Sequence, residues 1–350
     1  MAKKREKHYS GIGGQAVLEG IMMKNKERYA VAVRKPNGEI EVEVDNYQGI
    51  THGKKIGNLP FVRGVFNFVD SLILGMKTLN YSASCYEEEE EKEPESKVDA
   101  SLDKVSKGHG ETLMSTLVFV CALVFAIGIF MLLPFYLTNL LKDYVRNDSL
   151  LAIIEGVIRI LIFLIYVLSI SLMKDIRRTY MYHGAEHKCI NCLEKGRPLT
   201  VKHVMRNSRL HRRCGTSFLL FVMFISVILF FFIRVDNMAL KVLLRIALIP
   251  VIAGISYEVL RLAGRSDNFL IRIISAPGML LQRLTTKEPT PDMVEVAIAA
   301  VEAVFDWKRY LKDEFGYEVD ETWADDYDSS KVMEEEVEAA EVQGDDRVSD

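Results

Sequence analysis

Two histidines and a glutamate stand within five residues, at a spacing that suits metal chemistry. His183, Glu186 and His187 form the pattern H-x-x-E-H. On a helix, residues four apart share one face, so both imidazoles could bind a single ion. In the inverted zincins such a pair binds zinc, and the glutamate serves as general base. The pattern predicts a divalent metal site, with zinc as the expected ion and Glu186 as the catalytic base; a polar stretch without metal is the alternative.

A second cluster that could supply ligands lies just before an apolar run. His211 and Cys214 belong to the stretch HRRCGTS. If the apolar runs on either side of this region pack as antiparallel helices, His211 or Cys214 could complete a tetrahedral set of nitrogen and sulfur ligands. Three protein ligands leave one position open for catalysis, whereas four close the site and make the ion structural. The alternative is that these side chains cap helices at a membrane boundary.

Cys189 and Cys192 form a CxxC pair beside the histidines. Such a pair could be redox-active or half of a zinc knuckle, but the sequence contains no second CxxC. We therefore interpret both as reduced cytosolic thiols outside the site. The five cysteines of the chain do not suggest an extracellular disulfide framework.

A glycine-rich stretch, GGQAVLEG, occupies residues 13–20. A dinucleotide-binding motif would need a strand before these glycines and a helix after them, and the sequence indicates neither. We predict tight backbone turns in a loop that presents Gln15 and Glu19.

The elements that must position these residues are mostly apolar helices. Crossing a bilayer takes about 20 apolar residues, and four segments are long enough: 113–140, 150–173, 216–233 and 239–260. The sequence predicts a mainly α-helical polytopic membrane protein, with a four-span membrane domain over 112–265. Glu155 and Arg159 stand four apart within the second segment, and we expect them to pair with each other.

Loop charges predict the orientation of the chain. The connection 174–213, part of a basic loop over 174–215, contains eleven Lys and Arg against three acids. Positive loops stay in the cytoplasm, so an even number of spans places both termini there, in a bacterial inner membrane. No apolar run follows the basic N-terminus, so we expect no cleavable signal peptide. The basic loop could contact anionic lipid or a protein; we expect no specific nucleic acid, and a homo-oligomer is an open alternative.

The N-terminal region, 1–85, is predicted to be small and of mixed α/β structure. RYAVAVR and EIEVEV alternate apolar and polar residues around a KPNG turn, which predicts a β-hairpin. Residues 59–79 are amphipathic at helical spacing, so we predict a helix on the membrane surface or on the bundle, with a fifth span as the alternative. Residues 86–111 are expected to be an acidic linker.

The C-terminal region, 266–315, is predicted to contain two elements. The apolar segment 269–284 is interrupted by Pro277 and Gly278, which favours a re-entrant or interfacial pair of half-helices. Thr290 and Pro291 indicate the start of a helix. An apolar stripe follows, formed by Val294, Ile298, Val301 and Phe305. The acidic tail, 316–350, is predicted to be disordered.

Four ordered motifs resemble those of the YqhQ-like family of bacterial membrane proteins. They are GGQAVLEGIMM (13–23), YHGAEHK (182–188), HRRCGTSFL (211–219) and PGMLLQRLTTKEPTPDMVEVAIAA (277–300). The resemblance covers about 10–310, and members of that family are described as predicted metal-dependent enzymes. It implies a site of His183, Glu186, His187, His211 and Cys214, with Gln15, Glu19, Gln282, Glu288 and Glu295 behind them.

Three functions are consistent with these residues. The first is a metal-dependent membrane enzyme, expected to be a hydrolase, with Glu186 as general base. The second is a non-enzymatic membrane scaffold or assembly factor whose polar clusters are structural. The third is a transporter, in which Glu155, Arg159 and the break at Pro250 and Gly254 line a path.

Overall fold

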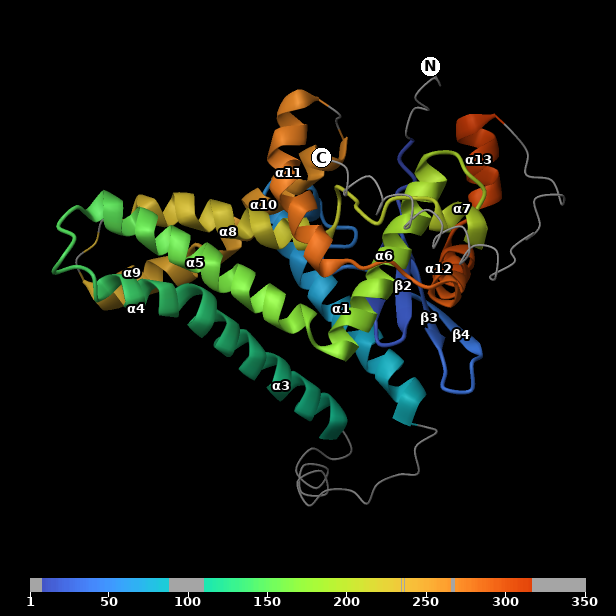
Figure 1. Ribbon diagram of the computed structural model, residues 1–350, viewed down its shortest axis with the longest axis horizontal. Coiled ribbons are helices and arrows are strands. Elements are labelled where there is room, and N and C mark those ends of the chain that lie inside the picture. Colours follow the sequence, from blue (N-terminus) through green and yellow to red (C-terminus); the bar gives the residue numbers. More distant parts are fainter. Residues whose placement is uncertain (1–7, 88–109, 234, 236, 266–267, 317–350) are drawn as a thin grey trace, which may run out of the picture.

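The computed structural model describes residues 8–87, 110–233, 235, 237–265 and 268–316. The expected acidic linker, apart from its two ends, and the expected tail after Gly316 lie outside these residues. Figure 1 shows the apolar helices together on one side and a small sheet with its covering helices on the other. The predicted combination of long apolar helices and a small N-terminal sheet is confirmed.

The sheet has four antiparallel strands in the order β1-β2-β3-β4. They are β1 (Gly13–Val17), β2 (Gly20–Asn25), β3 (Arg28–Arg34) and β4 (Ile40–Asn46). The predicted hairpin, β3 with β4, is confirmed. The predicted glycine loop is wrong, because residues 13–25 form a second hairpin in which Gln15 pairs with Met22. A side chain at Gly14 would lie 2.6 Å from the Met22 carbonyl, so the glycine permits the close pairing of β1 with β2.

Strand β3 is buried on both faces, which explains its run of small and branched apolar residues. Ala30 and Ala32 face the core that β3 shares with helix α6 (Lys174–Glu194) and helix α12 (Pro291–Val304), and α12 packs directly on the strand. Tyr29, Val31 and Val33 point to the other face, toward α1 (Val62–Glu87). The period of two along the strand therefore separates two cores.

The predicted amphipathic helix at 59–79 is confirmed as α1, which follows a short 3₁₀ turn, η1 (Lys55–Asn58), and extends further than expected. It crosses the sheet at one end and helix α10 (Ile249–Arg265) at the other. At the second crossing Arg63 pairs with Glu258 at 2.5 Å. Helix α1 is not among the described helices that are long and apolar enough to cross a membrane, so the fifth-span alternative has no support.

Three stretches of the described chain are long and apolar enough to cross a membrane. One is Thr116–Asn139, which joins α3 (Gly110–Ile127), a π-helical turn η2 (Gly128–Leu132) and α4 (Leu133–Asn139). The others are α5 (Asp148–Ser171) and Met238–Gly264, which joins α9 (Met238–Ala247) to α10. The predicted third span is the shorter apolar helix α8 (Gly215–Phe231), so four spans are not confirmed.

The predicted basic loop over 174–215 is wrong for most of its length. Residues 174–194 form helix α6, and a short helix, α7 (Val201–Met205), follows. Helix α6 lies at the centre of the fold, where Tyr182, Ala185 and Ile190 are buried against the sheet and α12. Its charged residues gave the segment a loop-like composition, whereas one apolar face holds it in the core.

The predicted break at Pro277 is also wrong. Residues Phe269–Thr285 form one helix, α11, with Pro277 inside it, and this helix packs along α8. A side chain at Gly278 would lie 2.7 Å from Ser217 Oγ, so this glycine allows the close contact between the two helices. Tertiary packing therefore stabilises a helix that proline alone would interrupt.

The predicted start of the last long helix is confirmed. Pro291 occupies the first position of α12 and Thr290 the capping position, although the Thr290 side chain makes no capping hydrogen bond. The apolar stripe faces the sheet and α6, with Val294 and Val301 fully buried. A final helix, α13 (Trp307–Phe315), ends at Gly316 in the left-handed conformation.

Candidate metal centre

The two histidines of the H-x-x-E-H pattern lie on one face of α6. Their ring centroids are 4.4 Å apart, as expected for positions one helical turn apart. His187 is buried, whereas His183 is partly exposed. The helix thus holds both imidazoles on the side that faces the beginning of α8 and the end of α11.

Cys214 completes a group of three candidate ligands with these histidines. It is the N-capping residue of α8, and its Sγ accepts a hydrogen bond from the Thr216 amide. This Sγ lies 3.2 Å from His183 Nε2. One ligand atom from each of His183, His187 and Cys214 lies within 4.8 Å of the other two. The structure therefore brings Cys214 to two histidines that stand 27 and 31 residues before it in the sequence.

Both imidazoles are oriented by backbone carbonyl groups. His183 Nδ1 lies 3.0 Å from the Thr285 carbonyl oxygen, and His187 Nδ1 lies 2.6 Å from the Arg209 carbonyl oxygen. A carbonyl only accepts hydrogen bonds, so Nδ1 is the donor in each ring and Nε2 keeps its lone pair. Histidines that bind metals are commonly held in this way by their second nitrogen.

The donor set fits a zinc ion. Two imidazole nitrogens and one thiolate sulfur are ligands that zinc prefers, and the ligand atoms of a tetrahedral zinc site lie about 3.3–3.7 Å apart. The separation of 3.2 Å between His183 Nε2 and Cys214 Sγ is close to this range. Three protein ligands would leave a fourth position for water or substrate.

His211 lies beside this group without belonging to it. Its ring centroid is 5.6 Å from that of His187, and its Nε2 lies 3.4 Å from Arg213 Nη2 and 3.6 Å from Glu194 Oε2. Burial lowers the pKa of His211 to about 4, although Glu194 opposes the shift. Burial would raise the pKa of Glu194, but His211 and Arg213 outweigh it and lower that pKa to about 2.

The lowered pKa of His211 predicts an acid-sensitive fold. The folded state favours neutral His211, so its contribution to stability is complete above pH 6.5 and is lost as the pH falls toward 4. We expect the free energy of unfolding to decrease by about 3 kcal/mol across this window. Chemical unfolding at a series of pH values should show the decrease in the wild type and in His52→Gln, whose imidazole is half-exposed. An unchanged slope in His211→Gln would contradict the assignment.

Glu186 is buried and faces strand β1 rather than standing among the three candidate ligands. It accepts a hydrogen bond from the Gly14 amide, and a side chain at Gly14 would lie 3.0 Å from its Cγ. Burial raises the pKa of Glu186, and the neighbouring His183 and the Gly14 amide oppose the shift. If Glu186 acts as a general base, its carboxylate must reach a water molecule near the three candidate ligands from the side of α6 that faces the sheet.

Gln282 holds the backbone that carries His211 and Cys214. This fully buried side chain of α11 donates to the His211 carbonyl at 2.7 Å and to Ser217 Oγ at 2.8 Å, and it accepts from the His211 amide at 2.8 Å. The family resemblance implied that Gln282 belongs to the site. Its contacts show that it positions the segment before α8.

The segment between α11 and α12 lies across the histidine face of α6. The Lys287 amide donates to the Tyr180 carbonyl at 2.9 Å, and a side chain at Gly184 would collide with the Lys287 carbonyl. Glu288 pairs with the buried Lys188 at 2.6 Å and with Arg209 at 3.2 Å. Glu288 therefore fastens this segment over α6, and the glycine of the H-x-x-E-H pattern provides the space for it.

The remaining implied residues hold the sheet to the helices and lie outside the ligand group. The Gln15 amide packs against Gly75 of α1. Glu19, in a left-handed turn, pairs with Arg178 and accepts from Tyr182 Oη at 3.2 Å. Glu295 pairs with Arg34 at 2.8 Å.

Cys189 and Cys192 are fully buried in the core between α6 and its neighbours. Burial raises the pKa of both thiols, that of Cys192 to about 12. Protonated and inaccessible thiols are poor nucleophiles and poor ligands, which supports their interpretation as packing residues.

The roles of Thr285 and Arg209 in orienting the two histidines could not be predicted from the sequence. Each orients a histidine through its backbone carbonyl, and a carbonyl is common to every residue type. The only local signal was the H-x-x-E-H spacing itself.

Comparisons with known proteins place the chain in a family. The profile of the family described as "Protein of unknown function (DUF1385)" matches residues 59–307. The chain is 35% identical over 291 residues to "Uncharacterized protein YqhQ" of Bacillus subtilis (strain 168), covering 82% of this chain and 89% of that protein. No solved structure matches. The resemblance predicted from the four motifs is confirmed: the chain belongs to the DUF1385 family, the family of YqhQ.

Proposed function

We propose that this protein is a metal-dependent membrane enzyme, a hydrolase, whose ion is bound by His183, His187 and Cys214. The observation that carries the proposal is the convergence of their three ligand atoms within 4.8 Å. Support comes from the two Nδ1 hydrogen bonds, which leave the Nε2 atom of each neutral ring unprotonated and so able to bind a cation. A divalent ion such as zinc is the proposed cofactor.

The chemistry divides between the ion and the chain. When bound, a zinc ion polarises a water molecule or a substrate oxygen. In this proposal Glu186 takes the proton from the attacking water, because it lies one helical turn after His183, close enough for that imidazole to oppose the rise in its pKa, and is shielded from solvent. Gln282 and Glu288 are positioning residues. Gln282 holds the segment that contains Cys214, and Glu288 holds the segment between α11 and α12 across α6.

The proposed location is a bacterial inner membrane, with α8 as a fourth span and both termini in the cytoplasm. The excess of Lys and Arg over 174–213 supports this orientation. Cys214 immediately precedes apolar α8, and α6 begins three residues after α5, so the candidate centre would lie at the cytoplasmic membrane boundary. The basic residues of this region would contact anionic lipid headgroups.

Metal analysis of the purified protein tests the proposal. We expect about one equivalent of zinc per chain in the wild type and in Glu186→Gln, and its loss in His183→Ala and Cys214→Ser. His203→Ala is a matched control, because this histidine of α7 lies outside the ligand group. A wild type without stoichiometric metal would refute the site, and full metal retention in both ligand variants would refute the ligand assignment.

One observation favours a non-enzymatic scaffold as the second candidate. Glu186 already has a structural partner, the Gly14 amide, and so could serve to join α6 to the sheet. The two functions differ in a complementation assay in a strain that lacks the gene. If the protein is a hydrolase, Glu186→Gln should bind metal but fail to complement the strain. If the protein is a scaffold, every variant that folds and binds metal should complement it, including Glu186→Gln.

A further inference from the structure

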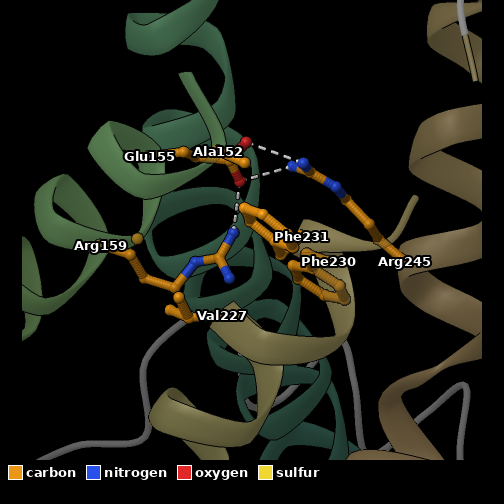
Figure 2. Close-up of a pocket in the computed structure, with 8 residues that line it drawn as sticks. Ala152, Glu155, Arg159, Val227, Phe230, Phe231 and Arg245 are labelled. Carbon is orange, nitrogen blue, oxygen red and sulfur yellow. Dashed lines mark hydrogen bonds and ion pairs between the residues drawn. The ribbon is translucent and has the colours of Figure 1, made fainter. Parts of the chain in front are cut away.

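A second polar cluster lies among the apolar helices and takes no part in the candidate metal centre. Glu155 and Arg159 of α5 form the predicted ion pair, at 2.6 Å. Arg245 of α9 joins them, with its two terminal nitrogens 2.7 Å and 2.8 Å from the Glu155 oxygens. Figure 2 shows the carboxylate between the two guanidinium groups, with Phe230 beside them.

The cluster is not neutral. Two guanidinium groups face one carboxylate, and the three residues are between 2% and 7% exposed. No other acidic side chain pairs with either arginine within the part of the chain that the structure describes. The Phe230 ring lies 4.7 Å from Arg159 Cζ and 5.0 Å from Arg245 Cζ, which offsets part of the charge. The cluster therefore has a net charge of +1 in a buried position, where an uncompensated charge is costly.

Hydrogen-bond donors are also left over. Arg159 uses one terminal nitrogen on Glu155 and the other on Ser226 Oγ at 3.1 Å. Arg159 Nε and Arg245 Nε are buried and donate to no acceptor among the described residues. Buried donors normally have a partner, so the cluster lacks at least one acceptor.

A small cavity adjoins these groups. Its lining includes Glu155, Arg159, Val227, Phe230 and Arg245, from three different helices. The cavity volume is about 10 Å³, roughly the room of one water molecule. A chloride ion is somewhat larger than a water molecule and would need small shifts of the lining side chains, whereas a phosphate group is far too large for this space.

We infer that this cavity binds one monovalent anion of halide size, chloride being the ion of that class most available to a cell. A halide accepts several N–H donors at once and cancels the residual positive charge, whereas a water molecule would supply only the acceptor. The bound anion would hold α5, α8 and α9 together, because Arg159, Phe230 and Arg245 come from these three helices.

Thermal unfolding in detergent micelles tests the inference on the full-length protein. At constant ionic strength, replacing gluconate by chloride is expected to raise the unfolding midpoint of the wild type by about 3 °C. Bromide should have the same effect and sulfate, which is too large, should not. Arg245→Gln removes the residual charge, so its midpoint should not depend on chloride. Lys241→Gln is the matched control, one turn away on α9 and outside the cavity lining, and should respond like the wild type.

A direct measurement covers the case in which Arg245→Gln does not fold. Exchange with a protein site broadens the ³⁵Cl magnetic resonance signal of chloride, and bromide should reverse this broadening in the wild type. The inference is overturned if the wild type neither broadens the signal nor responds to chloride, if sulfate stabilises as much as chloride, or if folded Arg245→Gln keeps the full response.

Discussion

Replacing Glu155 by alanine is expected to lower the free energy of unfolding by about 3–5 kcal/mol, the usual cost of removing one partner of a buried ion pair. The variant leaves Arg159 and Arg245 buried without a counter-charge, and it removes the acceptor of three close contacts. The penalty should be large because both guanidinium groups are buried among apolar helices, where an unpaired charge is costly.

Unfolding by denaturant in detergent micelles would measure this loss. Asp148→Ala is a suitable control, since it removes an exposed acid from the first turn of the same helix. Its effect should be within about 1 kcal/mol. Equal stability of the two variants would show that Glu155 is not the counter-charge of the cluster.

Replacing Gln282 by alanine is expected to lower the free energy of unfolding by about 3–5 kcal/mol as well. The buried amide makes three hydrogen bonds, two of them to the backbone of His211. Without it, a buried N–H and a buried C=O lose their partners, and each unsatisfied group costs about 1–3 kcal/mol. Cys214, three residues further on, would no longer be held against His183, so the proposed metal site predicts a zinc affinity about 10- to 100-fold lower in this variant.

Two measurements separate these effects. Denaturant unfolding of the metal-free protein reports the first, and competition with a zinc chelator reports the second. Arg283→Ala changes the next residue of α11, which is exposed, and should leave both values near those of the wild type. A Gln282→Ala variant of wild-type stability would mean that the segment before α8 is held by other contacts.

The parts of the fold that sequence predicted well are those in which one local pattern repeats. The uncharged runs indicated α3, α4 and α8, the apolar segment RYAVAVR beside the KPNG turn indicated β3, and Thr290 with Pro291 indicated the start of α12. In each case the pattern follows directly from burial of one face or of the whole element, so neighbouring residues contain the information.

The errors arose where distant contacts override a local preference. Helix α6 was expected to be a loop because of its charges, yet its apolar face packs on the sheet and α12. The glycines at 13–20 indicated turns, although Gly14 and Gly20 are needed for close strand pairing. Pro277 indicated a break, but α8 packs along α11 and supports the helix.

The sequence by itself determined the apolar helices, the β-hairpin of β3 and β4, and the pair of histidines one turn apart. It could not choose between His211 and Cys214, because both stand in one short polar stretch. Only the tertiary structure decided this. Glu194, the last residue of α6, lies beside the His211 ring, and Gln282 of α11 binds the His211 backbone, whereas the capping position of α8 places Cys214 beside His183. The opening H-x-x-E-H pattern is thus a local consequence of helical geometry, whereas its third candidate ligand depends on where separate helices begin and end.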